Sequence, residues 1–138
     1  MTDLVIKAIS VLREKGLRIT EQRKAILKVL ANAKSPMSAE ENYSKLSNVH
    51  CDLVTVYRCL EQFLKAGVVE LGVRENGTRV YCLGHGQGHH HHLTCRKCGQ
   101  SKRVDICMGD ALEEIAHGFG YSEVTHVMEV FGVCPVCS

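Results

Sequence analysis

Residues 53–83 read LVTVYRCLEQFLKAGVVELGVRENGTRVYCL, and this stretch decides the fold. Apolar residues recur with helical spacing from about Leu53 to Ala66. Two short runs rich in β-branched residues follow, Val68–Val73 and Arg79–Leu83, on either side of the turn signal Asn76-Gly77. The stretch therefore predicts a helix followed directly by a β-hairpin.

The residues that precede this stretch predict further helices. Apolar side chains at helical spacing open the chain, and Thr20 can cap a second helix. Ser38 and Glu41 stand three positions apart in the pattern of a capping box, which predicts the start of a short third helix. Helices followed by a hairpin give the order of a winged helix-turn-helix, which we expect over residues 1–83.

The helix over residues 53–66 has two different faces. At 100° per residue, its apolar side chains fall on one side, which must pack on the core. Arg58 lies near the middle of the opposite side, with Thr55 beside it and Tyr57 on the border. Arginine suits bidentate contact with guanine in a major groove, and threonine or tyrosine can touch a thymine methyl group. We interpret this element as a DNA recognition helix; the alternative is an ordinary solvated face.

Composition limits the class of protein. The chain has 138 residues, 45% of them hydrophobic and 23% charged, which is typical of one or two small folded domains. No apolar run approaches the roughly 20 residues of a membrane span, and no basic-then-apolar leader opens the chain. We therefore expect a cytoplasmic protein with no membrane partner.

Charge and metal-binding residue types are unevenly distributed. Residues 1–83 carry 13 Lys and Arg against 9 Asp and Glu, whereas residues 84–138 carry 4 against 6. The sequence also contains eight Cys and eight His, which is unusual for so short a chain. In a reducing compartment, clustered thiols more often bind metal than form structural disulfides. A mildly basic front half thus precedes a back half rich in metal ligands.

Two CxxC pairs predict a structural zinc site. They are Cys95 with Cys98 and Cys134 with Cys137, and each pair places two thiolates on one tight turn. Together they complete a tetrahedral shell of four sulfurs, which favours zinc and leaves no open position for a substrate. The rival interpretation is a redox role, because CxxC pairs also form disulfides.

A histidine run and the hairpin predict a regulatory metal site. In a strand, His90 and His92 point one way, while His89 and His91 point the other. A hairpin centred on Asn76 places Glu70 opposite Cys82, close enough to share one ion. Glu70, Cys82, His90 and His92 would form a mixed site in which the thiolate favours zinc over Fe(II) or Mn(II). His85 could replace Glu70, and the plain alternative is a solvated Glu70 beside a small core cysteine.

A second regulatory site is expected on the other face of the run. There, His89 and His91 need partners, and His126 is one candidate in a strand expected over Glu123–Phe131. Asp110, in the first turn of a helix ending near His117, is another, and Glu113 could replace it. The remaining thiols and isolated imidazoles have no visible partners and are expected to be plain structural residues: Cys51, Cys59, Cys107, His50 and His117.

The motifs in this order resemble the ferric uptake regulator (Fur) family over nearly the whole chain. They are Leu17-Arg-Ile-Thr-Glu-Gln-Arg23, Ser38-Ala-Glu, Thr55-Val-Tyr-Arg58, the histidine run, the first CxxC pair and Phe131-Gly-Val-Cys-Pro-Val-Cys137. The resemblance implies an α+β protein. A winged-helix DNA-binding domain over residues 1–83 would be followed by a hinge over 84–92, and by a small α/β dimerisation and metal-binding domain over 93–138.

The resemblance also implies a function. Family members are homodimers that bind palindromic operators in double-stranded DNA when loaded with metal and repress transcription, with no enzymatic activity and no small-molecule substrate. By this likeness Tyr57 and Arg58 face bases, and Arg18 and Arg23 contact the groove or phosphates. Two rival classes are a zinc hydrolase, which needs an open coordination position and a poised base, and a zinc buffer without DNA binding.

Departures from the family pattern indicate a branch. Iron and peroxide sensors usually have a histidine where this chain has Pro36, and iron sensors usually have glutamate where it has Cys82. Cys82, together with His90 and His92, resembles the pattern of the zinc uptake regulator branch, which implies two or three Zn²⁺ per subunit. Asp110 stands where the family usually has glutamate in the second site. An iron, manganese or peroxide sensor of the same family is the alternative.

Overall fold

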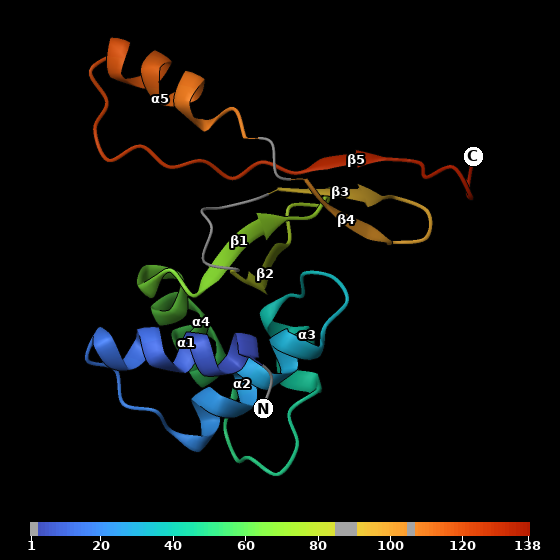
Figure 1. The fold of residues 1–138 in the computed structure, drawn as a ribbon. Coiled ribbons are helices and arrows are strands. Elements are labelled where there is room, and N and C mark those ends of the chain that lie inside the picture. Colours follow the sequence, from blue (N-terminus) through green and yellow to red (C-terminus); the bar gives the residue numbers. More distant parts are fainter. Residues whose placement is uncertain (1–2, 85–90, 105–106) are drawn as a thin grey trace. The chain divides into compact units, whose positions relative to one another are not determined.

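The computed structural model describes residues 3–84, 91–104 and 107–138 (Figure 1). The chain divides into two compact units, residues 1–88 and 89–138, and each is described by itself. The division falls within the segment 84–92 that was expected to be a hinge. Among the described residues, no helix is long and apolar enough to cross a membrane.

The first unit begins with helices whose starts follow the predicted caps. Thr20 accepts a hydrogen bond from Arg23 N at the start of α2, and Ser38 forms the predicted capping box with Glu41 at the start of α3. Asp52 caps α4, which ends at Gly67 with a left-handed φ of 82°. The elements are α1 (Asp3–Glu14), α2 (Glu21–Asn32), α3 (Ala39–Ser44) and α4 (Leu53–Ala66).

The core of the first unit is mainly aliphatic. Leu12, Ile26, Leu60 and Phe63 are each fully inaccessible to solvent, and the apolar face predicted for α4 is buried. Burying such a side chain contributes roughly 1.5–3 kcal/mol relative to leaving it exposed. This unit therefore has an apolar core of its own.

The predicted hairpin is confirmed, with β1 over Val69–Val73 and β2 over Arg79–Leu83. The strands pair antiparallel, and Glu70 lies opposite Cys82, as the sequence predicts. Gly77 has a φ of 89° in the connecting turn, a conformation that favours glycine.

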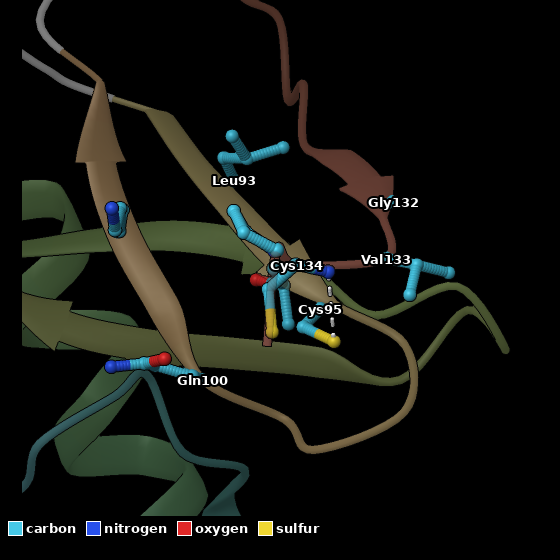
Figure 2. A pocket seen from close by; sticks show the side chains of 9 residues that line it. Leu93, Cys95, Gln100, Gly132, Val133 and Cys134 are labelled. Carbon is cyan, nitrogen blue, oxygen red and sulfur yellow. Dashed lines mark hydrogen bonds between the residues drawn. The ribbon is translucent and has the colours of Figure 1, made fainter. Parts of the chain in front are cut away.

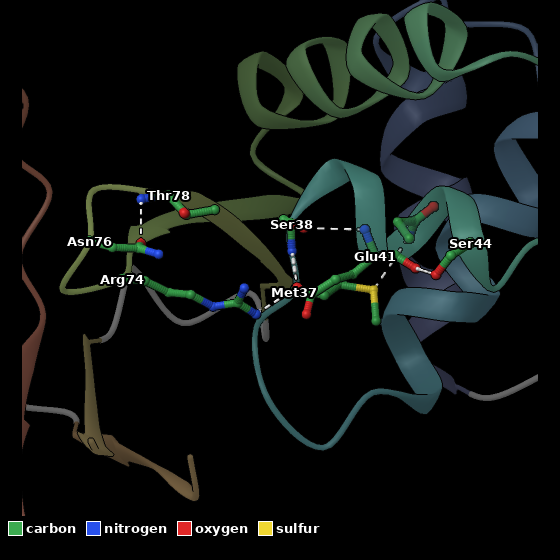
Figure 3. Close-up of polar contacts among 8 residues, drawn as sticks. Met37, Ser38, Glu41, Ser44, Arg74, Asn76 and Thr78 are labelled. Carbon is green, nitrogen blue, oxygen red and sulfur yellow. Dashed lines mark hydrogen bonds and ion pairs between the residues drawn. The ribbon is translucent and has the colours of Figure 1, made fainter. Parts of the chain in front are cut away.

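A polar cluster ties this hairpin to α3 (Figure 3). Glu41 Oε1 accepts a hydrogen bond from Ser38 N at 2.8 Å and also pairs with Arg74 Nη2 at 2.5 Å. Met37 and Tyr81 exchange backbone hydrogen bonds of 3.0 and 2.8 Å beside this pair. Arg74, which directly follows β1, is therefore held by Glu41, the residue that completes the capping box of α3.

The second unit contains a three-stranded sheet in the order β4-β3-β5 among its described residues. Strands β3 (His91–Cys95) and β4 (Ser101–Val104) are antiparallel, while β3 and β5 (Val130–Gly132) are parallel. The helix α5 (Gly109–Gly118) begins just before Asp110, as expected.

The strand expected over Glu123–Phe131 is wrong for most of its length, because β5 begins only at Val130. Side chains make hydrogen bonds just ahead of β5. The His91 ring binds Met128 O at 2.8 Å, and Glu129 Oε2 accepts from His92 N at 2.9 Å. Glu123 also has a φ of 54°, which interrupts an extended chain.

Candidate metal centres and nucleic-acid interface

The structure brings the four CxxC cysteines together at one end of the sheet. Cys95 ends β3, and Cys134 follows β5, the strand that runs parallel beside it. One sulfur from each of Cys95, Cys98, Cys134 and Cys137 lies within 4.8 Å of the others. Cys98 Sγ and Cys134 Sγ are 3.9 Å apart, and a tetrahedral zinc with Zn–S bonds of about 2.3 Å separates its sulfurs by about 3.8 Å.

Backbone hydrogen bonds prepare this cluster for a cation. The N–H groups of Cys98 and Cys134 each donate to Cys95 Sγ at 3.4 Å and lower the pKa of that thiol to about 5. Figure 2 shows the hydrogen bond from Cys134. The hydrogen bond with Cys134 and then burial raise the pKa of Cys137 to about 12. One sulfur therefore ionises readily while another resists ionisation, and a bound cation allows all four to be thiolates.

A second cluster of potential ligands consists of His91, Cys107 and His126. Cys107 Sγ lies 3.3 Å from His91 Nε2 and 3.3 Å from His126 Nε2, and the two ring nitrogens are 3.4 Å apart. His91 comes from β3, Cys107 lies two residues before the start of α5, and His126 lies in the segment before β5. His91 is buried and the other two are half-buried.

This cluster differs from the expected second site. The expectation that Cys107 has no partner is wrong, because its sulfur contacts both imidazoles. Asp110 and Glu113 are exposed, and neither belongs to a ligand cluster of the described residues. His89 lies outside the described residues. Spacing could not reveal Cys107, because its neighbours are 16 and 19 positions away.

The residues expected in the first regulatory site lie in both units. Glu70 and Cys82 are half-buried partners across the β1–β2 hairpin. His92 is in β3, where its Nδ1 lies 3.5 Å from Glu129 Oε1. A carboxylate at one ring nitrogen orients a histidine and leaves the other nitrogen available to a metal. His90 and the alternative ligand His85 lie outside the described residues.

The exposed face of α4 carries the side chains expected to contact DNA. Arg58 is exposed, and Tyr57 is 41% exposed, with its hydroxyl donating to the Glu40 carboxylate. This hydrogen bond raises the pKa of Tyr57 and lowers the pKa of Glu40. Thr55 is half-buried, and its hydroxyl donates to the capping Asp52 at 2.7 Å.

The two arginines near α2 differ in their surroundings. Arg18 is exposed. Arg23 is half-buried, and its guanidinium donates to the Arg18 carbonyl and to Gln62 Oε1, the latter at 2.9 Å. Arg23 therefore links the start of α2 to α4.

A winged-helix unit joined to a unit with clustered metal ligands defines a class, the metal-responsive transcription regulators. Comparison with known proteins agrees with this class. The model of the "Ferric uptake regulator family" matches residues 14–131. The chain therefore belongs to the ferric uptake regulator family, and it is a transcription regulator rather than an enzyme.

Relatives within the family are named for the uptake of different metals. The chain is 36% identical over 130 residues to the ferric uptake regulation protein of Legionella pneumophila, covering 91% of this chain and 95% of that protein. It is 37% identical over 127 residues to the zinc uptake regulation protein of Mycobacterium tuberculosis, covering 88% and 95% respectively.

A solved structure supports the fold. The crystal structure of the Vibrio cholerae ferric uptake regulator matches with a TM-score of 0.63 at 35% identity, covering 91% of this chain and 98% of that one.

Proposed function

We propose that this protein is a zinc-responsive repressor that binds palindromic operator DNA as a homodimer. In this proposal residues 1–83 bind DNA, 84–92 form a hinge, and 93–138 support dimerisation. Cys95, Cys98, Cys134 and Cys137 hold a structural Zn²⁺, while Glu70, Cys82, His90 and His92 hold the regulatory one. With the second cluster, the total is two or three Zn²⁺ per subunit.

The observation that carries the choice of zinc is the pairing of Cys82 with Glu70 across the hairpin. Directly opposed residues in an antiparallel pair have Cβ atoms about 4.5–5.5 Å apart, so a thiolate and a carboxylate can share one ion. Thiolate is a soft ligand that suits zinc better than Fe(II) or Mn(II). The similarity to a zinc uptake regulation protein supports the same choice.

The exposed face of α4 supports DNA binding. Arg58, Tyr57 and Val54 form a face with a guanidinium, a phenol and an apolar side chain, which together can read base edges and thymine methyl groups. The excess of basic residues in the first unit adds sequence-independent attraction to phosphates. Thr55 contributes by donating its hydroxyl to Asp52, the cap of this helix, and we propose Arg18 as a phosphate contact and Arg23 as its support.

The surface of the second unit supports a homodimer. No residue of α5 is buried. Large apolar side chains are exposed on this helix and on the segments around it: Met108, Leu112, Ile115, Phe119, Tyr121 and Val130. Such a surface is unfavourable in water, and a second copy of the same unit would cover it.

The regulatory ligands can couple metal to operator binding. Glu70 and Cys82 precede the Gly-rich segment, and His90 and His92 follow it, so sharing one cation restricts the chain between them. Restriction holds two recognition helices at the separation that a palindrome demands. Metal and DNA then favour the same dimer, and couplings of this kind amount to about 1–3 kcal/mol.

An iron, manganese or peroxide sensor is the alternative within the family. The Legionella pneumophila relative, which is named for ferric uptake, favours it. Titrating operator binding with Zn(II), Mn(II) and Fe(II), with and without peroxide, distinguishes these sensors. The zinc sensor is supported if operator binding is half-maximal at a lower free concentration of Zn(II) than of Mn(II) or Fe(II), and if peroxide does not change it.

Replacing Cys82 tests the proposal. Cys82→Ser should remove zinc-dependent operator binding, because the serine hydroxyl is a poor substitute for a thiolate ligand. The four-cysteine site should keep its zinc, and the dimer should persist. Gel-shift titration with zinc, metal analysis and sedimentation measure these three properties.

Cys51→Ser is the matched control. Cys51 is a half-buried thiol of the same unit and belongs to no ligand cluster of the described residues. It should leave the zinc response unchanged. A Cys82→Ser protein with the full zinc response would show that Cys82 is not part of the sensor.

A further inference from the structure

We propose that Cys107 is a metal ligand and that, with His91 and His126, it binds a thiolate-preferring divalent cation such as Zn²⁺, which anchors α5 to the sheet. The inference rests on the proposed function in one respect, since it concerns the second of the metal sites proposed there. It is independent of the sensor site at Glu70 and Cys82.

The distances between the three ligand atoms match one face of a coordination tetrahedron. In a zinc tetrahedron with Zn–N bonds of about 2.0–2.1 Å and Zn–S bonds of about 2.3 Å, two nitrogens lie about 3.3–3.4 Å apart and a sulfur lies about 3.5–3.6 Å from a nitrogen. The two ring nitrogens are 3.4 Å apart, and the sulfur lies 3.3 Å from each of them, within about 0.3 Å of the tetrahedral values. A single cation can therefore contact all three atoms.

Surrounding hydrogen bonds orient two of the ligands. His91 Nδ1 lies 2.8 Å from Met128 O, a carbonyl that can only accept, so the proton resides on Nδ1 and the Nε2 lone pair points at the cluster. Gly109 N donates to Cys107 Sγ at 3.2 Å. Backbone and carbonyl partners of this kind fix ligands around protein-bound metals.

The position of Gly109 shows that the cluster leaves no room for a larger residue there. A Cβ at this position would lie 2.8 Å from His126 Cε1 and 3.1 Å from Cys107 Sγ. Both contacts are shorter than ordinary van der Waals distances. Glycine therefore lets the start of α5 approach the two ligands closely.

The sulfur of Cys107 determines which cation this site prefers. A carboxylate in the place of Cys107 would suit Mn(II) or Fe(II), whereas a thiolate with two imidazoles favours zinc and its analogue Co(II). Cys107 therefore acts as a specificity-determining ligand. It makes the second site selective for zinc without any help from Glu70 or Cys82.

The site also connects three segments of the second unit. No residue of α5 is buried, and the segment from Tyr121 to Glu129 forms no strand. A cation held by His91 of β3, by Cys107 two residues before α5 and by His126 before β5 links them. Metal binding then stabilises the arrangement of the second unit, as it does in small metal-dependent domains.

Cobalt spectroscopy in a Cys82→Ser background tests the proposal. The full chain carries zinc at the four-cysteine site, verified by metal analysis before and after titration with Co(II). A thiolate-to-cobalt charge-transfer band should appear, because Cys107 is then the ligand sulfur available outside that site. Cys82→Ser/Cys107→Ser should lose the band, and Cys82→Ser/Cys51→Ser should keep it.

Alkylation of the otherwise unaltered chain gives a measurement that needs no variant. Saturating Zn(II) added to protein with zinc at the four-cysteine site should protect Cys107 from iodoacetamide at least about tenfold, while Mn(II) should not. Cys51 is the internal reference. Equal labelling of Cys107 with and without zinc, or a charge-transfer band that survives Cys107→Ser, would overturn the proposal.

A carboxylate variant tests the specificity. Cys107→Asp should bind Mn(II) more tightly than the wild-type cysteine does and give no charge-transfer band in the Cys82→Ser background. An unchanged preference for Zn(II) over Mn(II) would contradict the role of the sulfur. These readouts do not involve DNA, so they remain informative even if operator binding proves independent of zinc.

Discussion

Two cysteines show that the role of a residue depends on its neighbours. Cys59 and Cys107 both lack a nearby cysteine in sequence. Cys59 is buried in the apolar core of the first unit, where burial raises the pKa of its thiol and disfavours the thiolate. Cys107 is half-buried between two imidazoles and a backbone N–H. The first is a packing residue and the second has the surroundings of a ligand.

Arg58 should carry sequence readout. We expect Arg58→Ala to weaken binding to the specific operator by about 1–3 kcal/mol and to relax discrimination at one base pair, because a bidentate contact to guanine is lost. Competition binding with operators altered at single positions measures both effects.

Lys65→Ala is the control for charge. Lys65 is exposed in the last turn of the same helix. Its loss should weaken binding evenly across sequences and reduce the salt dependence. If Arg58→Ala behaves in the same way as Lys65→Ala, Arg58 does not read bases.

At the residue scale, the sequence predicted those contacts between residues that the local backbone geometry determines. The opposition of Glu70 and Cys82 follows from the turn position alone, because a hairpin has one register for a given turn. The approach of Cys107 to His91 and His126 depends on how α5 and the segment after it return to β3. No local pattern contains that information.

At the scale of elements, one side chain serves both a helix and the wing. Glu41 completes the capping box of α3 and pairs with Arg74 at the end of β1 (Figure 3). Burial opposes ionisation of this carboxyl, but hydrogen bonds from Ser38 and Arg74 outweigh it and lower its pKa. The ionised form therefore favours the folded state.

Glu41→Ala should destabilise the first unit by about 1 kcal/mol at neutral pH, because Ser38 N loses the carboxylate that completes the capping box of α3. The surface ion pair adds less, since both side chains are more than 40% exposed. A lowered folded pKa gives stability that is present above the usual value of 4.5 and is lost as pH falls through the folded value. Thermal unfolding at several pH values measures both effects.

Glu41→Gln is the matched variant. Glutamine keeps the capping hydrogen bond but cannot titrate. It should cost less than Glu41→Ala at neutral pH and flatten the acid dependence below pH 4.5. An acid dependence identical to that of the wild type would assign the effect to other carboxyls.

Elements with strong local signals were predicted, and those held by side chains were not. The bounds of α4 and β2 agree with the pattern, because caps and the turn set them locally. The segment before β5 alternates like a strand. Just ahead of the short ladder between β3 and β5, however, its contacts with β3 involve side chains: the His91 ring binds Met128 O, and the Glu129 carboxylate accepts from His92 N.

At the scale of the whole molecule, the two units are stabilised differently. The first has a continuous apolar core that includes α1, α2, α4 and the hairpin. In the second, the buried residues among those described are His91 and Cys95, and both belong to ligand clusters. A unit this small without an apolar core needs metal or a partner copy to stay folded.

Breaking the four-cysteine cluster should therefore unfold the second unit selectively. Cys95→Ser removes the sulfur that accepts two backbone N–H groups and should cause loss of the structural zinc and of dimerisation. The first unit should keep its fold, because none of its core residues depends on that site. Sedimentation and hydrogen exchange resolved along the chain measure the two outcomes. Cys51→Ser removes a thiol outside both clusters, so this variant should remain dimeric and keep the wild-type protection from hydrogen exchange. A stable dimer of Cys95→Ser would show that the sulfur cluster does not maintain the second unit.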